Sequence, residues 1–264
     1  NVDIVFTPGG TFFSKDVPYI SMSQNMLVFE EKERNRFNSK IAILRYKILE
    51  FLQVKSLSNS CGNIFISNYA ELFICSKHRN VSLVSSEIIF HGISKKFITK
   101  PRYQKKATEY SLDNPFKLLY VSIVNVYKHQ WNVVQAIHDL RKEGLPISLE
   151  LIGSSNKKSL EKLIRVIDKT EGAKYLGFVK YENLHNYYHK SDAFVFASSC
   201  ENMPNILVEA MSAGLPIASS NYGPMPEILG DSGIYFDPLD LDSLKEGIKT
   251  LFLNHTLRLK MAET

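Results

Sequence analysis

Two carboxylates stand eight positions apart in a segment whose pattern predicts a strand, a loop and a helix. Glu201 follows an apolar run at 193–197, which is short enough for a strand buried on both faces. Pro204 stands where a first helical residue would, Glu209 follows on the helix, and Gly214 marks the helix end. Ligands of open α/β sheets bind at the carboxyl ends of the strands. The segment therefore predicts a ligand site beside Glu201.

The start of this expected helix suits an anion. The backbone N–H groups around Asn205, Ile206 and Leu207, together with the positive end of the helix dipole, favour a phosphate group. The alternative is that both glutamates are solvated charges near a helix end, and their spacing alone does not decide between these interpretations.

The composition is that of an ordinary globular protein long enough for two domains. Of the 264 residues, 44% are hydrophobic and 22% are charged. The formal net charge of +5 is spread along the chain, so nucleic acid is not predicted as a partner. Cys61, Cys75 and Cys200 lack metal-binding spacing, and their odd count favours reduced thiols in the cytoplasm. No apolar run in the sequence is long enough to span a bilayer.

Strands and helices alternate regularly in the second part of the chain, which predicts a doubly wound parallel sheet. The polar stretch 95–114 between the two parts predicts a domain boundary, with domains at 1–104 and 105–264. The chain opens at Asn1 inside a strand-like run and stops at Thr264 inside an expected helix, so we expect a fragment of a longer protein. The expected elements are strands at 117–121, 148–152, 192–197 and 216–219, and helices at 130–141, 159–169, 204–213 and 241–253.

The first part also contains strands, expected at 2–6, 19–22, 63–66 and 87–90, and one long helix. Ser39 can cap this helix, which we expect over 40–55. The charged run 30–36 is most simply a solvated face. The residues expected on the apolar side of the long helix are Ile41, Leu44, Ile48, Leu49 and Leu52.

The carboxylate segment resembles a known signature. Glu201-Asn-Met-Pro, then Glu209-Ala-Met-Ser-Ala-Gly-Leu-Pro, is similar to the E-x7-E motif of retaining family 4 glycosyltransferases, and the similarity continues into Pro226-Glu227-Ile228. This family is also described as glycosyl transferases group 1. The resemblance implies an α/β protein of the GT-B fold, with two Rossmann-like doubly wound domains facing across a cleft. The domain at 1–104 would be an incomplete acceptor-side domain, and 105–264 would bind the nucleotide sugar.

The resemblance also implies roles for single residues. Glu201 is the expected catalytic carboxylate, Glu209 would accept the ribose hydroxyls, and Lys128 falls on a family lysine that contacts the donor diphosphate. Ile123 stands where the family has an arginine, so one of two cations is replaced. No metal and no cofactor are expected. The donor-binding residues are Lys128, Glu209, Asn202, Met203, Asn205, Ile206, Leu207, Gly153, Phe178 and Val179.

Two further residues are expected on the acceptor side. Gln24 stands where the family often has a histidine near the reacting sugar. Asn25 is a candidate for bonding an acceptor hydroxyl or for capping the following turn.

The function implied is transfer of a sugar, with retention, from a nucleotide diphosphate sugar to a hydroxyl of a polysaccharide or lipid-linked glycan. This would occur in the cytoplasm, with peripheral association at the inner face of the membrane left open. Two alternatives stay open: a nucleotide-sugar epimerase on the same fold, and a noncatalytic module that binds nucleotide sugars.

Overall fold

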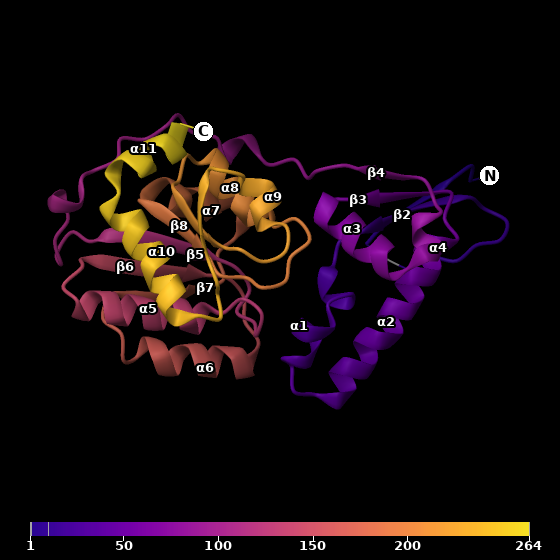
Figure 1. Ribbon diagram of the computed structural model, residues 1–264, viewed down its shortest axis with the longest axis horizontal. Helices are drawn as coiled ribbons and strands as arrows, with labels where there is room; N and C mark the ends of the chain where they lie inside the picture. Colours follow the sequence, from indigo (N-terminus) through magenta and orange to yellow (C-terminus); the bar gives the residue numbers. More distant parts are fainter. Residues whose placement is uncertain (1, 10, 264) are drawn as a thin grey trace. The chain divides into compact units, whose positions relative to one another are not determined.

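The chain folds into two α/β units, and each unit is built on one parallel sheet (Figure 1). The structure is a computed structural model that describes residues 2–9 and 11–263, so the expectations at Asn1 and Thr264 lie outside it. Two parallel sheets confirm the predicted α/β class. The first unit consists of residues 1–92, 200–203 and 223–228, and the second of 93–199, 204–222 and 229–264.

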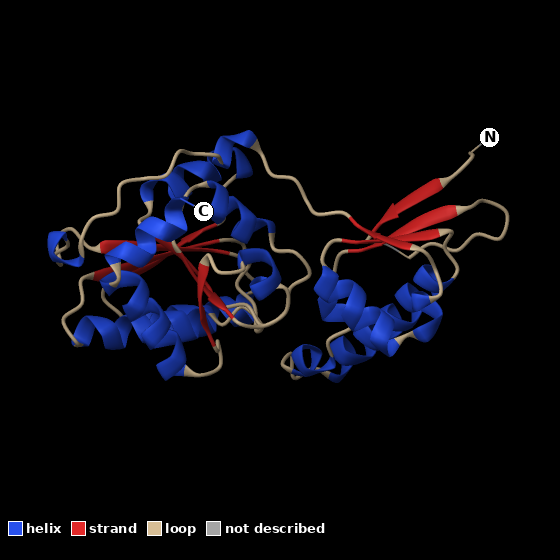
Figure 2. Cartoon of the chain, turned by 45° about the horizontal axis from the view of Figure 1, so that its top comes forward, coloured by secondary structure: helices blue, strands red, loops and turns tan. Residues whose placement is uncertain are grey.

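Four strands form the sheet of the first unit in the order β1, β2, β3, β4, and Figure 2 shows its helices gathered on one face. The hydroxyls of Ser39 and Ser67 cap its two longest helices by accepting from the N–H groups of Ala42 and Ala70. The predicted second, third and fourth strands and the cap at Ser39 are confirmed, whereas the first strand covers Val5–Pro8 and not 2–6. The elements are β1 (Val5–Pro8), β2 (Tyr19–Ser23), η1 (Met26–Val28), α1 (Glu31–Asn35), α2 (Lys40–Ser58), β3 (Gly62–Phe65), α3 (Asn68–Lys77), α4 (Arg79–Ser82) and β4 (Ser86–Ile88).

The apolar side predicted for the long helix is wrong at three positions. Ile41, Leu44 and Ile48 on α2 are 83%, 61% and 52% exposed. The helix instead turns Tyr46 and Leu57 toward its own unit, where Tyr46 contacts the Phe37 ring and Leu57 is buried. Apolar residues stand on both faces of α2, so the spacing could not show which face points inward.

The charged run 30–36 is not the solvated face that was expected. Glu33 and Arg34 on α1 are both buried. Arg34 donates to the carbonyl of Val28 at 2.6 Å and to the Glu50 carboxylate at 2.5 Å, and Arg36 pairs with Glu33 at 2.7 Å. These partners compensate for the loss of water around the buried charges.

The second unit has a six-stranded sheet in the order β10, β9, β8, β5, β6, β7. The eight strand and helix ranges predicted for this unit are confirmed, and β7, α7, β10, α9 and α11 lie outside them. No helix in the described part of the chain has both the length and the apolar content to cross a membrane. The elements are η2 (Lys95–Phe97), η3 (Ala107–Glu109), β5 (Phe116–Val121), α5 (Gln130–Lys142), β6 (Ile147–Ile152), α6 (Lys157–Ile167), β7 (Ala173–Gly177), α7 (Tyr181–Lys190), β8 (Ala193–Phe196), α8 (Asn205–Ser212), β9 (Ile217–Ser220), α9 (Met225–Leu229), β10 (Gly233–Phe236), α10 (Leu241–Leu253) and α11 (His255–Glu263).

Strand β8 is at the centre of this unit. Its residues are completely buried, and it lies between β5 and β9. The Phe194 ring stacks on Tyr188 of α7, with ring centroids 5.6 Å apart. Burial on both faces explains the continuous apolar run at 193–197. The carboxyl end of this strand is therefore held on a rigid base.

A half-buried carboxyl group links two elements of the first unit. The Tyr69 hydroxyl on α3 donates to Glu30 Oε1 at 3.1 Å, just after η1. Burial raises the pKa of Glu30 from 4.5 to about 7, although the hydrogen bond from Tyr69 opposes this shift. The folded protein therefore keeps a proton that the unfolded chain releases at lower pH.

This raised pKa predicts a pH-dependent stability. Between about pH 4.5 and pH 7 the folded state binds more protons than the unfolded state, so the stability falls as the pH rises. Glu30→Gln, which mimics the protonated group, should stabilise the protein by about 1–3 kcal/mol at pH 8 and change little at pH 4. Thermal unfolding of both proteins across this range measures the effect. Parallel pH profiles of the two proteins would contradict it.

Candidate functional site

The chain between β8 and α8 begins the candidate site. Ser198 and Ser199 follow β8 and are buried, and the Ser199 N–H donates to the Tyr127 carbonyl at 2.8 Å. Pro204 is the N-cap residue of α8 and gives the first turn no side-chain hydrogen bond. Gly214, after the helix, has a φ of +62°, the left-handed conformation expected for a glycine that ends a helix.

Glu209 lies on α8 with its carboxylate buried in the second unit. The Tyr188 hydroxyl donates to Glu209 Oε2 at 3.0 Å. Burial raises the pKa of Glu209, and the hydrogen bond from Tyr188 opposes the rise. A buried carboxylate with an oriented hydroxyl partner is not the solvated charge at a helix end that was the alternative for Glu209.

Lys128 lies between β5 and α5 and is buried in the second unit. Its ammonium group is 5.2 Å from the ring centroid of Tyr127 and 5.3 Å from that of Phe196. The Tyr120 hydroxyl donates to the Lys128 carbonyl at 2.5 Å, which fixes the backbone here. The structure therefore places Lys128 beside the carboxyl end of β8, where the sequence predicted a phosphate contact.

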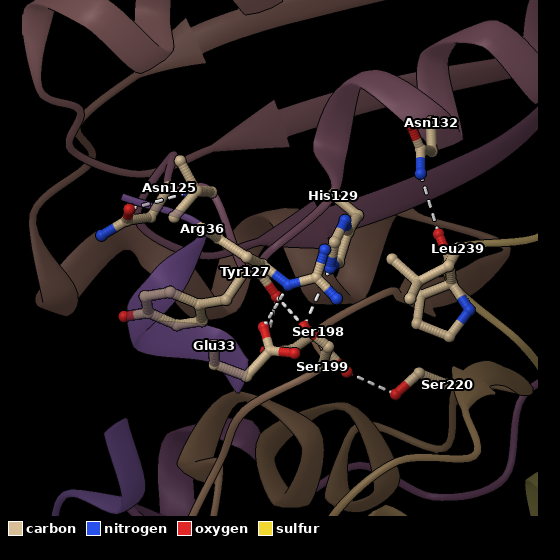
Figure 3. Close-up of polar contacts among 12 residues, drawn as sticks. Glu33, Arg36, Asn125, Tyr127, His129, Asn132, Ser198, Ser199, Ser220 and Leu239 are labelled. Atoms are coloured by element: carbon tan, nitrogen blue, oxygen red, sulfur yellow. Dashed lines mark hydrogen bonds and ion pairs between the residues drawn. The ribbon is translucent and has the colours of Figure 1, made fainter. Parts of the chain in front are cut away.

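His129 follows Lys128, and sequence reasoning gave it no firm role. Its φ is +49°, a left-handed conformation uncommon for residues other than glycine. Its imidazole Nε2 lies 2.9 Å from Ser199 Oγ, and Figure 3 shows this contact beside the bond between the Ser220 hydroxyl and the Ser198 carbonyl. A strained backbone held by a buried hydrogen bond is typical of a functional site. A single sequence carries no signal for this conformation.

Gly153 follows β6 and has a φ of +151°. A Cβ atom here would lie 2.0 Å from the Ser122 carbonyl oxygen, so only glycine fits. The close approach that the sequence predicted is made to the backbone after β5. Contact of Gly153 with a donor stays a prediction.

The remaining donor-side residues lie at strand and helix ends. Phe178 is 71% exposed and Val179 is half-buried, directly after β7. In the first turn of α8 the Asn205 side chain is exposed, Ile206 is half-buried and Leu207 is buried. The Leu207 N–H donates to the Pro204 carbonyl at 3.0 Å, so a ligand contact through this N–H would compete with that bond. The predicted donor contacts of these residues stay predictions.

Glu201 lies in a segment of the first unit, residues 200–203, in which the two residues that follow the carboxylate are held by hydrogen bonds. The buried Asn202 donates from Nδ2 to the Ser23 carbonyl at 3.0 Å, and its Oδ1 accepts from the Ser67 hydroxyl at 3.1 Å. The Met203 sulfur accepts from the His91 N–H at 3.3 Å. The side chains of Asn202 and Met203, both predicted to bind the donor, thus have partners in the protein that fix the backbone beside Glu201.

The first turn of α3 also binds residues 223–228, the other late segment of the first unit, through Glu227. The Glu227 carboxylate accepts from the backbone N–H groups of Asn68 and Tyr69, both at 2.8 Å, and from Asn68 Nδ2 at 2.9 Å. A carboxylate at a helix N-terminus is favourable because it meets unpaired N–H groups and the positive end of the dipole. The sequence showed Glu227 only as part of the motif, because its partners Asn68 and Tyr69 lie 159 and 158 residues away along the chain.

Gln24 and Asn25 follow β2 and are both exposed. The Asn25 side chain accepts from the Leu27 N–H at 3.0 Å, so its alternative role as a cap is confirmed. Gln24 lies against Gly9, whose φ is +67°. In the described part of the chain, no three His, Cys, Asp or Glu side chains are grouped as metal ligands would be.

Comparison with known proteins identifies a family for the second part of the chain. The family model described as glycosyl transferases group 1 matches residues 102–264. O-antigen chain mannosyltransferase B of Escherichia coli is 39% identical over 75 residues, which are 28% of this chain and 20% of that protein. The matched stretch therefore spans about a fifth of the relative.

Solved structures share the fold over nearly the whole chain. Sucrose-phosphate synthase from Thermosynechococcus elongatus superposes with a TM-score of 0.73 at 18% identity, over 94% of this chain and 61% of that one. HepE of Anabaena, solved in complex with UDP and glucose, gives a TM-score of 0.69 at 16% identity, over 94% and 65%. These similarities confirm the predicted GT-B fold.

The two hydrogen bonds of Asn202 predict a local effect of their removal. Asn202→Ala leaves the buried Ser23 carbonyl without this donor, which costs about 1–3 kcal/mol. Hydrogen exchange of the backbone amides at 200–203 should therefore speed up by about tenfold or more in the full-length protein. Asn132→Ala is the matched control, because Asn132 bonds the Pro238 carbonyl in the second unit. Unchanged exchange at 200–203 would show that Asn202 does not hold this segment.

Proposed function

Since the chain belongs to the family of glycosyl transferases group 1, we propose that the full-length protein transfers a sugar from a nucleotide diphosphate sugar to a hydroxyl acceptor with retention. The observation that carries this proposal is the buried Glu209 carboxylate on α8, which the Tyr188 hydroxyl orients. A carboxylate fixed in this way can accept both hydroxyls of a ribose. HepE, which shares the fold, was solved with UDP and glucose, and this supports a nucleotide-sugar donor.

In the proposed reaction the bond between the anomeric carbon and the diphosphate breaks, which leaves negative charge on the phosphate oxygens. Lys128 and the backbone N–H groups of Asn205 and Ile206 at the start of α8 would stabilise that charge. Both groups belong to the second unit and follow neighbouring strands, β5 and β8. The proposed diphosphate contact would therefore come from two elements of the fold.

Glu201 is the proposed catalytic carboxylate. Its negative charge would stabilise the positive charge that develops at the anomeric carbon and would also hold sugar hydroxyls. Stabilisation of that kind requires a fixed position, and Asn202 supplies it through two buried hydrogen bonds. Met203 supports the same segment, so we propose that both neighbours act mainly by positioning Glu201.

The acceptor we propose is a hydroxyl of a polysaccharide or lipid-linked glycan. The E. coli relative is named an O-antigen chain mannosyltransferase, which supports a glycan acceptor. Gln24 and Asn25 would lie on the acceptor side, and Gly153, Phe178 and Val179 on the side of the nucleotide. The odd number of cysteines favours a reducing compartment, so we propose that the reaction takes place in the cytoplasm.

Two alternatives make different predictions. An epimerase would convert the nucleotide sugar without any acceptor, and a noncatalytic module would bind it without turnover. The replacement of family residues at Gln24 and Ile123 motivates the second alternative. Incubating the full-length protein with a panel of nucleotide sugars and glycan acceptors distinguishes all three, because only a transferase gives an acceptor-dependent product. The anomeric proton coupling of that product, measured by NMR, tests retention.

Lys128 gives a prediction for the diphosphate contact. Lys128→Ala should weaken binding of a nucleoside diphosphate by about 1–3 kcal/mol, the usual range for a charged hydrogen bond. Binding of the free nucleoside should stay nearly unchanged, as calorimetry can measure. Lys142→Ala, at the opposite end of α5, is the control and should change neither affinity. An equal loss for both ligands in Lys128→Ala would indicate damage to the fold.

The raised pKa of Glu209 gives a prediction for pH dependence. The ionised carboxylate accepts ribose hydroxyls better than the protonated group, so nucleoside diphosphate affinity should rise with pH as Glu209 loses its proton. Glu209→Gln should remove this step from the pH profile. Calorimetric titrations of the two proteins with the same nucleotide measure it. Retention of the step in the variant would assign it to another group.

A further inference from the structure

A cavity of about 330 Å³ lies at the amino ends of three strands of the second unit, β5, β6 and β7. Its walls include Leu112, which precedes β5, and His138 and Arg141, which lie near the end of α5. Lys169, just after α6, contributes another wall. Helices α5 and α6 pack side by side (Figure 1), so their ends bring these basic side chains to one place.

This cavity is separate from the proposed donor site. In a parallel sheet the residues that precede the strands and those that follow them lie at opposite edges, and Lys128 follows β5. The six residues of β5, at about 3.3 Å each, place roughly 20 Å between the two edges. The proposed transfer reaction therefore gives the cavity no role.

The Arg141 guanidinium is held in one orientation. Its Nη1 donates to the Ile147 carbonyl at 3.0 Å. A Cβ atom on Gly172 would lie 3.0 Å from the same nitrogen, so the guanidinium packs closely against the backbone of this glycine, whose φ is +80°. The Gly172 carbonyl accepts from the Leu149 N–H at 2.8 Å, which ties this backbone to β6. The charged group is thus positioned before any ligand binds.

The positive charge of the cavity is only partly balanced. Arg141 Nη2 lies 3.8 Å from the Glu171 carboxylate, and the Glu171 side chain is 94% exposed. An ion pair of this length with an exposed carboxylate contributes little, because water screens it. Lys169 adds a second cation, and the His138 ring adds an N–H donor. The cavity therefore suits an anion.

The alternative is that these cations only stabilise the helices. Arg141 lies in the last turn of α5 and Lys169 directly follows α6, where positive charge compensates the helix dipoles. That role requires neither a shared cavity nor a guanidinium that Ile147 and Gly172 hold in place. It explains where the charges stand in the sequence and leaves their geometry unexplained.

We propose that this cavity binds a phosphate group, as free phosphate or as a small sugar phosphate. A phosphate dianion presents oxygens in several directions, which suits donors on the ends of two helices, whereas a carboxylate can be satisfied by the guanidinium alone. Arg141 and Lys169 supply the charge, and His138 supplies a further hydrogen bond. Leu112 offers an apolar wall to the carbon atoms of a sugar phosphate. This binding does not depend on the proposed transfer reaction.

Calorimetric titration of the full-length protein at constant ionic strength tests the proposal. The probes are inorganic phosphate and ribose 5-phosphate, and ribose is the uncharged control. At least one probe should bind saturably with a Kd of about 1 mM or lower, and ribose should not bind. Tighter binding of ribose 5-phosphate identifies a sugar phosphate as the ligand, and equal or weaker binding identifies free phosphate. Absence of saturable binding of both probes up to about 10 mM would overturn the proposal.

Charge variants connect the binding to the cavity. Lys169→Gln changes an exposed side chain and should weaken phosphate binding by about tenfold or more. Glu171→Gln removes a repelling charge and should strengthen binding by about two- to fivefold, an effect that helix stabilisation alone does not predict. Lys158→Gln, which changes an exposed lysine at the opposite end of α6, is the control and should bind like the wild type.

Two further variants determine where the phosphate binds. Arg141→Gln should weaken binding by about tenfold or more, and circular dichroism shows whether the variant is folded. Lys128→Ala should bind phosphate like the wild type, because Lys128 lies at the other edge of the sheet. Loss of binding in Lys128→Ala with wild-type affinity in Lys169→Gln would place the anion at the donor edge and overturn the proposal. Failure of the transfer reaction alone would leave all these affinities unchanged.

Discussion

The buried side-chain amide of Asn202 is the contact on which the placement of Glu201 depends. Its Nδ2 group donates to the Ser23 carbonyl, and its Oδ1 atom accepts from the Ser67 hydroxyl. Ser67 also caps α3, so the same hydroxyl group joins a helix start to the segment that carries the carboxylate. A buried side-chain amide without a partner costs free energy, so loss of either hydrogen bond would destabilise the conformation of this segment. A short segment without regular structure thereby gains the rigidity that a reacting group requires.

In the second unit, the candidate ligand-binding residues are positioned at one edge of the parallel sheet. β5 and β8 are neighbours, so the residues that follow them, Lys128 and Ser199, lie at one edge. Glu209 lies on α8 and accepts a hydrogen bond from Tyr188 of α7. Gly153 lets the backbone after β6 approach that after β5 to a distance no other residue permits. Phosphate contact and ribose contact thus come from elements whose positions the buried core determines.

Local sequence patterns predicted many of the strands, helices and helix caps. The features that they did not predict depend on contacts between residues far apart in the sequence. The alternation of short apolar runs with helices gave the second sheet, and Ser39 gave the start of α2, because these signals lie within a few neighbouring residues. The outward face of α2 could not be predicted, since apolar residues stand on both of its faces. The partners of Glu227, the burial of Glu33 and the backbone conformation of His129 depend on segments far away along the chain. The roles of Glu201 and Glu209 in sugar transfer stay predictions.

The division of labour between those two carboxylates is the central claim, and steady-state kinetics of the full-length enzyme tests it most directly. Glu209→Gln should raise the KM for the donor and weaken nucleoside diphosphate binding, because a ribose contact is equal in ground and transition states. Glu201→Gln should lower kcat by about tenfold or more, at least about 1.4 kcal/mol, and leave diphosphate affinity nearly intact. Equal effects of the two substitutions on kcat, KM and diphosphate affinity would contradict the account.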